Sequence, residues 1–483
     1  MGISAIFGNH PTANAIKSIA VGMLGRASNQ ISAVVLMLMA TQFLLPADFG
    51  TFALAAAFVT FARTMLYTGA FEYLVKAENA DDCASDCLAV TVGMSLAWVV
   101  LLILVGLAAP FIFSSATTGL LLLALAPSPV ISAIASWQES LLFRQGRLNA
   151  YYLVTALIEY ATVGLAIALL FQGFGVWSLA IQIYARAVLL VLAYVFMVKL
   201  PRMPWPSGKG MREVIGWSIP RYSSVTLTFG SNYGADIVLG IFLGPAATGI
   251  YRASNRIATA VADIFAQPAN LLSISILSRN KAKSVKPEGQ WLSIFSAFAL
   301  IGFPALGGLA ILADELVPLM LADEWIAAVP VLMVMCVIRM VSLVGVPAST
   351  NLVVLDRQVI LLRQQVVMVT LNIAVTCISA PFGSVAVALA LLATGLANMV
   401  WLLRLNFRIG TTSADVRRSL AVVVPPTLLA CGGAWAGNLA ASYMSASPLQ
   451  VLASAIGLSV ALWLAAVAVM RRKIATEMLA LRH

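Results

Sequence analysis

Charged residues are scarce in this chain of 483 amino acids. Only 10% of the residues are Asp, Glu, Lys or Arg, and 61% are hydrophobic. Soluble domains, by comparison, contain about 25% charged residues. The composition therefore excludes a water-soluble enzyme and a disordered chain, and it indicates a protein whose surroundings are mostly lipid.

Histidine and cysteine are also rare, and a common nucleotide-binding signature is missing. The two histidines, His10 and His483, lie near the ends of the chain, which excludes a histidine-based metal site or triad inside the membrane. The five cysteines do not form a disulfide scaffold, and we expect reduced thiols. No G-x-x-x-x-G-K-[ST] motif occurs, so nucleotide hydrolysis by that route is excluded. We expect no metal, cofactor, nucleotide or nucleic acid.

What the sequence contains instead is a series of long apolar segments. A membrane-spanning helix needs about 20 mostly apolar residues. Hydropathy, read against glycine, proline and charge breaks, predicts fourteen such spans: 17–44, 49–76, 87–113, 119–143, 151–171, 177–199, 217–243, 248–277, 291–313, 327–354, 359–380, 385–406, 419–440 and 450–470. The predicted fold class is an all-α polytopic membrane protein.

Lysine and arginine are unevenly distributed between the predicted loops. The chain carries 29 Lys and Arg against 19 Asp and Glu. If the N-terminus is cytoplasmic, no Lys or Arg falls in an outer loop, whereas inner loops carry clusters such as 279–286 and 471–473. Since short positively charged loops stay inside, we expect both termini to be cytoplasmic. The longest outer loop, 314–326, leaves little room for an extracytoplasmic catalytic domain.

Two pairs of short segments predict an internal repeat. Residues 46–52 resemble 245–251, and residues 174–180 resemble 382–388, in the same order along the chain. Each predicted half has six spans, an even number, so the repeat is parallel about an axis along the membrane normal. We therefore predict an N-terminal six-helix bundle, a linker, a C-terminal six-helix bundle, and two additional helices with a cytoplasmic tail: 1–200, 201–216, 217–406 and 407–483.

Seven of the arginines inside the predicted spans suggest a ligand site. They are Arg26, Arg63, Arg186, Arg221, Arg252, Arg256 and Arg339. Each costs several kcal/mol if it is isolated in the bilayer, so each should face a partner or a wet cavity. Only three acids, Glu159, Asp236 and Asp263, lie comparably deep. This excess of positive charge favours an anionic ligand, and guanidinium groups bind phosphate oxygens well.

Spans 7 and 8 carry the densest group of these polar residues. Arg221, Asn232 and Asp236 share one helical stripe, and Arg252, Arg256 and Asp263 share another. Because the chain turns near Pro245, Asp236 and Arg252 lie at a similar depth, and an ion pair between them is possible.

The candidate substrate-binding residues belong to both predicted halves. They are Arg26, Arg63, Arg221, Asn232, Asp236, Arg252, Arg256 and Arg339, and the candidate coupling residues are Asp236 and Asp263. A structural interpretation, in which an arginine pairs with an acid between packed helices, stays open for each. It is favoured most for Arg186 and Glu159 on spans 5 and 6.

Several ordered motifs carry a family resemblance. They include Leu45-Pro46-Ala47-Asp48-Phe49-Gly50 after span 1, the Leu142–Leu148 segment before span 5, and Gly173-Phe174-Gly175-Val176-Trp177 before span 6. The segments 236–245, 249–253 and 323–325 extend them, although Ala322 stands where glycine is common. In residues 17–406 the chain resembles polysaccharide-repeat-unit flippases of the multidrug/oligosaccharidyl-lipid/polysaccharide exporter superfamily, and most of all the branch that serves exopolysaccharides such as succinoglycan or colanic acid.

The resemblance implies a function without covalent chemistry. It implies transfer of undecaprenyl-pyrophosphate-linked oligosaccharide from the inner to the outer leaflet of the bacterial cytoplasmic membrane. Alternating access through a cationic central cavity is the implied mechanism, and polymerase and export proteins are the implied partners. It does not fix which arginines line that cavity.

Other functions stay open at this point. The nearest is a multidrug exporter of organic cations from the same superfamily, which a cationic cavity disfavours. Another is a membrane polysaccharide polymerase or ligase, which the short outer loops disfavour. A third is a non-transporting assembly subunit that binds other proteins through spans 13 and 14.

Overall fold

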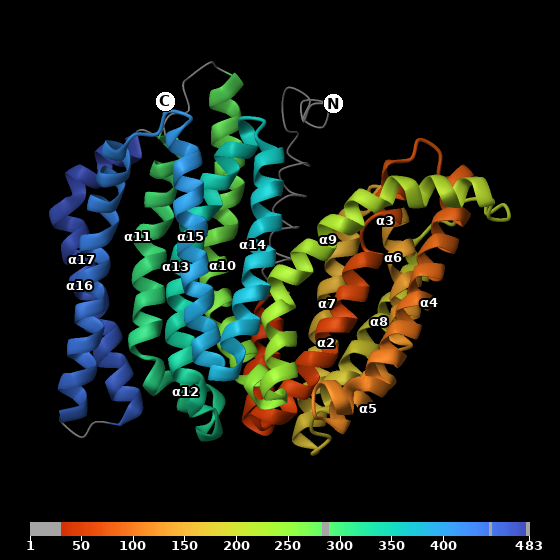
Figure 1. The fold of residues 1–483 in the computed structure, drawn as a ribbon, viewed down its shortest axis with the longest axis horizontal. Coiled ribbons are helices and arrows are strands. Elements are labelled where there is room, and N and C mark those ends of the chain that lie inside the picture. Colours follow the sequence, from red (N-terminus) through yellow and green to blue (C-terminus); the bar gives the residue numbers. More distant parts are fainter. Residues whose placement is uncertain (1–29, 283–288, 444–446, 480–483) are drawn as a thin grey trace. The chain divides into compact units, whose positions relative to one another are not determined.

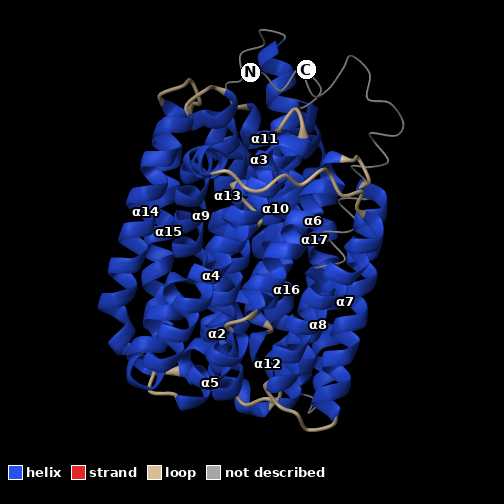
Figure 2. Ribbon diagram, turned by 90° about the vertical axis from the view of Figure 1, so that its right-hand side faces the viewer, coloured by secondary structure: helices blue, strands red, loops and turns tan. Residues whose placement is uncertain are grey.

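The computed structural model describes residues 30–282, 289–443 and 447–479, and all regular elements in these ranges are helices (Figures 1 and 2). This confirms the predicted all-α class. Arg26 lies outside the described residues. By its contacts the chain divides into two compact units: unit 1 runs to Tyr233 and includes Gly244–Ala246, and unit 2 contains Gly234–Leu243 and everything from Ala247 onward.

Both units consist of successive helices. Unit 1 contains a helix Gln30–Phe43, then α2 (Pro46–Leu66), α3 (Ala70–Lys76), α4 (Ala80–Ile112), α5 (Ala116–Leu125), α6 (Ser128–Arg144), α7 (Leu148–Phe171), α8 (Trp177–Met197) and most of α9 (Gly208–Leu243). Unit 2 contains the end of α9, all but the first two residues of α10 (Pro245–Ala282), α11 (Gln290–Ile311), α12 (Ala313–Leu321), η2 (Asp323–Ala328), α13 (Val329–Val354), α14 (Gln358–Ser379), η3 (Ala380–Phe382), α15 (Ser384–Phe407), α16 (Ser413–Tyr443) and α17 (Pro448–Leu479).

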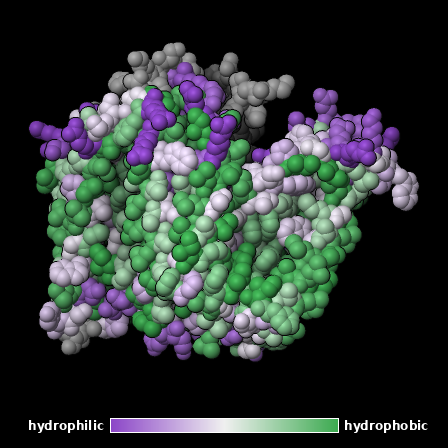
Figure 3. Space-filling view, viewed as in Figure 1, coloured by the Kyte–Doolittle hydropathy of each residue, from purple (hydrophilic) through white to green (hydrophobic). Residues whose placement is uncertain are grey.

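Twelve helical segments among the described residues are long and apolar enough to cross a membrane. They correspond to twelve of the fourteen predicted spans. The remaining two predicted spans fall on Gln30–Phe43, which is shorter in its described part, and on α9, which is richer in polar residues. The total of fourteen therefore stays a prediction. Hydrophobic side chains cover the sides of the helices, and hydrophilic ones gather at their ends (Figure 3).

The chain leaves the helical conformation between α2 and α3. The loop charges predict that this end of unit 1 is cytoplasmic. Gly69 has a φ of 62°, and a Cβ added there would meet the ring of Tyr222. Glycine is therefore needed both for the backbone conformation and for the close approach of α9. The Tyr222 hydroxyl accepts a hydrogen bond from the backbone N–H of Ala70 at 3.3 Å. Arg144 donates to backbone carbonyls at the end of α3, among them that of Glu78 at 2.6 Å.

The segment between α8 and α9 is bound to α4 by two acids. Asp81 Oδ1 accepts a hydrogen bond from the backbone N–H of Arg202 at 2.8 Å, and Asp86 Oδ1 accepts one from Ser207 at 2.6 Å. Ser207 caps α9, because its hydroxyl accepts from the N–H of Gly210 at 2.9 Å. This segment covers the first part of the predicted linker 201–216, and the rest of that linker lies in α9. The contacts place the unit boundary within α9, and the boundaries predicted from the repeat stay predictions.

The last two helices pack tightly into unit 2. Gly433 and Gly437 of α16 lie against the backbone of α17 around Leu458 and Ala455, as expected for small residues spaced four apart in membrane helices. Polar contacts add to this packing. The hydroxyls of Ser296 and Ser419 lie 2.5 Å apart, and Trp463 Nε1 donates to the carbonyl of Leu300 at 3.0 Å. Helices α16 and α17 are thus part of the core of unit 2.

Candidate functional site

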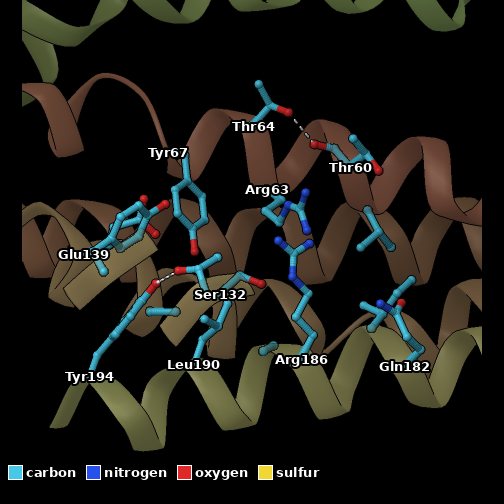
Figure 4. Close-up of a pocket in the computed structure, with 16 residues that line it drawn as sticks. Thr60, Arg63, Thr64, Tyr67, Ser132, Glu139, Gln182, Arg186, Leu190 and Tyr194 are labelled. Atoms are coloured by element: carbon cyan, nitrogen blue, oxygen red, sulfur yellow. Dashed lines mark hydrogen bonds between the residues drawn. The ribbon is translucent and has the colours of Figure 1, made fainter. Parts of the chain in front are cut away.

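Unit 1 contains a polar cavity of about 300 Å³ between α2, α6, α7 and α8 (Figure 4). Its main polar and aromatic lining residues are Arg63, Tyr67, Glu139, Tyr151, Gln182 and Arg186. We call it the N-terminal cavity. All four helices belong to segments long and apolar enough to cross a membrane, so a polar cavity at this place is unusual and is a candidate functional site.

Two arginines from different helices point toward each other in the N-terminal cavity. Arg63 comes from α2 and Arg186 from α8 (Figure 4). Arg186 Nε lies 2.8 Å from Oε2 of the buried Glu159 on α7. This confirms the structural interpretation of Arg186 and Glu159 as a pair between packed helices, although Arg186 also lines the cavity.

Arg63 differs from Arg186 in its partners. Its side chain is exposed to the cavity, and among the described residues it forms no ion pair. The adjacent carboxylate of Glu159 is thus paired with Arg186. Arg63 therefore remains available to bind a ligand.

The other end of the N-terminal cavity carries an acid and aromatic rings. Glu139 on α6 is 7% exposed and is hydrogen-bonded by the Tyr151 hydroxyl. The hydroxyls of Thr155 and Tyr194 lie 3.1 Å apart at the same end, and Tyr67 lies between Glu139 and the arginines (Figure 4). The cavity therefore presents hydrogen-bond donors and acceptors together with aromatic surface.

Unit 2 contains the predicted pair between Asp236 and Arg252. Arg252 Nη1 lies 2.9 Å from Asp236 Oδ2, and Asp236 is 1% exposed. The Thr248 hydroxyl donates to the backbone carbonyl of Asp236 at 3.2 Å and so joins the two helices again. The prediction of this ion pair is confirmed.

Arg339 of α13 lies beside the same part of α10. Its Nη2 donates to the amide oxygen of Asn255, a neutral partner, and its buried Nε has no hydrogen-bond partner among the described residues. Arg252 and Arg256 lie on α10 on either side of Asn255, and all three side chains are partly buried. We call Arg252, Arg256 and Arg339 the arginine cluster.

The remaining candidates lie elsewhere. Arg221 forms a bidentate ion pair with Glu72 of α3 and is half exposed. Asn232 is exposed on α9, and Asp263 is partly buried on α10. The structure thus brings Asp236, Arg252 and Arg339 together in unit 2 and places Arg63 in a separate cavity in unit 1.

Sequence reasoning missed Glu139, Tyr151 and Gln182 as site residues. Gln182 and Arg186 are one helical turn apart on α8, and this spacing was the one local signal. Glu139 lies near the inner end of the predicted span 119–143, and its contact with Tyr151 of the next helix depends on tertiary packing.

Comparison with known proteins is consistent with this fold. A family model described as "Polysaccharide biosynthesis protein" matches residues 39–330. The teichuronic acid biosynthesis protein TuaB of Bacillus subtilis (strain 168) is 28% identical over 151 residues, 31% of each chain. The lipopolysaccharide biosynthesis protein WzxC of Escherichia coli (strain K12) is 36% identical over 59 residues, 12% of each chain. The alignments thus span about a third or less of these relatives.

Solved structures show the same fold at low identity. The lipid II flippase MurJ, in an inward closed conformation, aligns with a TM-score of 0.75 and 15% identity over 95% of this chain and 100% of its own. An inward-facing multidrug resistance MATE family transporter of the MOP superfamily aligns with a TM-score of 0.56 and 13% identity over 81% of this chain and 96% of its own. The family match confirms that the chain is related to polysaccharide biosynthesis proteins, as the sequence motifs indicated, and the two solved structures show the same fold.

Proposed function

Because the chain belongs to the polysaccharide biosynthesis protein family, we propose that it is a flippase of undecaprenyl-pyrophosphate-linked oligosaccharide repeat units. In this proposal it moves the repeat unit from the inner to the outer leaflet of the bacterial cytoplasmic membrane for exopolysaccharide synthesis. It makes and breaks no covalent bond. Both termini lie in the cytoplasm, as the loop charges favour.

The state of Arg339 is the single observation that carries the proposal. A guanidinium on a membrane-spanning helix normally pairs with an acid, yet Arg339 donates to the neutral amide of Asn255 and keeps a buried Nε without a partner among the described residues. Phosphate oxygens accept two hydrogen bonds from one guanidinium. A pyrophosphate would therefore satisfy donors that the protein leaves unmatched.

The arginine cluster supplies the remaining positive charge for this role. The three arginines of the cluster lie on α10 and α13, and the two nearby acids are Asp236 of α9, which pairs with Arg252, and Asp263 of α10, so the formal excess is one positive charge. In the proposed cycle the cluster neutralises the pyrophosphate while the prenyl chain stays in lipid. Alternating access then exposes the bound head group to the other side. Asp236 or Asp263 could couple this step to a proton gradient by releasing an arginine when protonated.

The arginines also weigh against the nearest alternative. A multidrug exporter of organic cations needs acids or aromatic cages to hold a positive charge, whereas Arg339 sits beside Arg252 and Arg256. A polymerase or ligase would need a paired-acid or nucleophilic site, and its products would be new glycosidic bonds.

The direct test is transfer between leaflets. Purified protein is reconstituted in vesicles that contain a fluorescent undecaprenyl-pyrophosphate oligosaccharide, and the fraction accessible to a membrane-impermeant quencher is followed over time. We expect protein-dependent transfer, and we expect Arg339→Gln to slow it at least about tenfold, as for loss of a charged hydrogen bond. Arg212→Gln, at an exposed position, is the matched control.

Three outcomes would contradict the proposal. One is the absence of protein-dependent transfer. Another is the appearance of longer glycans, which would indicate a polymerase. The third is equal transfer by Arg339→Gln and Arg212→Gln, which would remove the arginine cluster from the mechanism.

A further inference from the structure

The N-terminal cavity contains as many acids as bases. Arg63 and Arg186 carry positive charges, and Glu139 and the adjacent Glu159 carry negative ones. Charges interact strongly where water is partly excluded, and the two carboxylates offset the attraction that the two arginines would exert on a multiply charged pyrophosphate. The cavity is therefore poorly suited to the anionic part of a lipid-linked substrate.

The same lining is well suited to hydroxyl groups. A carboxylate such as Glu139 only accepts hydrogen bonds, a guanidinium such as Arg63 only donates them, and the amide of Gln182 does both. A sugar hydroxyl can donate and accept, so one pyranose ring could serve all three side chains. Tyr67 and Tyr151 add aromatic faces with a polar end, which pack against the C–H groups of a ring.

The polar groups of the cavity also retain unused hydrogen-bonding capacity. The Arg63 guanidinium has five N–H donors and forms no ion pair within the described part of the chain. Glu139 is 7% exposed and is hydrogen-bonded by Tyr151, which uses only part of the capacity of its two oxygens. Buried polar groups are normally satisfied. This capacity points into the cavity, where a ligand or water would use it.

The size of the cavity limits what it can hold. Its volume of about 300 Å³ lies at the lower end of the range for small-molecule sites, about 300–1,000 Å³. One sugar unit can enter a space of this size, whereas a complete oligosaccharide cannot.

We propose that the N-terminal cavity is a sugar subsite that holds one pyranose unit of the transported oligosaccharide. Glu139 accepts hydrogen bonds from its hydroxyls, Arg63 donates to them, and Tyr67 lies against the ring. The inference rests on the proposed flippase function and deepens it, since it assigns the N-terminal cavity of unit 1 to a sugar of the glycan. Arg63, expected from the sequence to bind pyrophosphate, is thereby assigned to the glycan.

Binding measurements on defined lipids test this subsite. The full-length protein in detergent is titrated, with native mass spectrometry as the readout, with undecaprenyl pyrophosphate and with the same lipid carrying one glucose, galactose or N-acetylglucosamine. We expect at least one sugar-bearing lipid to bind about tenfold more tightly than the bare lipid, because new charged hydrogen bonds form. Equal binding of all four lipids by the unaltered protein would overturn the proposal.

Variants then locate the sugar. Glu139→Gln and Tyr151→Phe should reduce the preference for the sugar-bearing lipid to less than threefold and leave the affinity for bare undecaprenyl pyrophosphate unchanged. Glu78→Gln, the same substitution at an exposed glutamate, should keep the full preference. If Glu139→Gln does not fold, the lipid preference of Tyr151→Phe alone tests the subsite, because this substitution preserves the ring and removes only the hydroxyl. A full preference in Tyr151→Phe and Glu139→Gln would contradict the assignment.

The two proposals fail separately. If the preference for sugar-bearing lipid is present but vesicles show no transfer, the flippase function is wrong and the subsite stands as a binding site. If transfer occurs but no lipid preference is found, the subsite is wrong and the flippase function stands.

Discussion

Arg252 Nη1 lies 2.9 Å from Asp236 Oδ2, so that an ion pair joins the end of α9 to α10 beyond the turn at Pro245. Asp236 is 1% exposed, whereas the Arg252 side chain is 23% exposed. The acid is thus the more deeply buried partner, and its charge depends on the arginine. This relationship leads to the first prediction.

Replacing one partner of this pair should destabilise the protein. Arg252→Gln leaves the buried Asp236 carboxylate without its cation, and such a loss typically costs about 3–5 kcal/mol. We expect a clear fall in the melting temperature, measured by intrinsic tryptophan fluorescence in detergent. The double variant Asp236→Asn with Arg252→Gln should recover part of the lost melting temperature. Glu324→Gln, at an exposed position, should leave the melting temperature unchanged. A double variant less stable than either single variant would contradict this view of the pair.

Arg63 and Arg186 should respond differently to the same substitution. Arg186→Gln leaves the buried Glu159 without its ion-pair partner, so it should lower the melting temperature. Arg63→Gln breaks no ion pair in the described chain, so it should leave the melting temperature unchanged and slow leaflet transfer at least about tenfold. Melting curves and the vesicle assay on both variants check this. Equal melting temperatures would show that the pair with Glu159 contributes little.

Two adjacent glycines on α16 should differ sharply in their tolerance of alanine. A Cβ at Gly433 would lie 2.9 Å from the backbone oxygen of Leu458, whereas nothing lies within 4 Å of one at Gly432. Gly433→Ala should therefore destabilise the α16–α17 pair by about 1–3 kcal/mol through overpacking. Gly432→Ala should be neutral or slightly stabilising, because alanine favours the helix. Melting temperatures of the two purified variants test this, and identical values would contradict the tight packing.

The segment before α9 should be released when its contact with α4 is lost. Asp86 accepts from the backbone of Ser207, and a Cβ at Gly210 would collide with its carboxylate, whereas one at Gly208 would meet nothing within 4 Å. Gly210→Ala should therefore speed tryptic cleavage at the exposed Arg202 several-fold, and Gly208→Ala should not. Timed proteolysis with mass spectrometry gives the rates. Equal rates in both variants would mean that Asp86 does not hold the segment.

The orientation expected from the loop charges can be tested with single cysteines. In a background without the five native cysteines, Gln172→Cys should react with a membrane-impermeant maleimide from outside the cell. Asn149→Cys should react only after the membrane is permeabilised. Both positions are exposed and lie at opposite ends of one predicted span. The reverse pattern would invert the predicted topology.

The sequence by itself determined the class of the protein and one of its ion pairs. Composition and hydropathy predicted an all-α membrane protein, because lipid requires apolar helices whose backbone hydrogen bonds are internal. The Asp236–Arg252 pair was predictable because the two residues lie on consecutive helices at similar distances from one turn, where helix rise alone sets their depth. The motifs of residues 45–50 and 173–177 indicated the family.

Tertiary structure alone decided which partners the other arginines have. Arg63 meets Arg186 and Glu139 across helices distant in the sequence, and Arg221 pairs with Glu72 in the same way. Such contacts depend on how each helix is rotated about its axis and which neighbours it packs against. Position along a helix sets the depth of a side chain in the membrane, whereas the packing of small and large side chains between helices decides which way it faces.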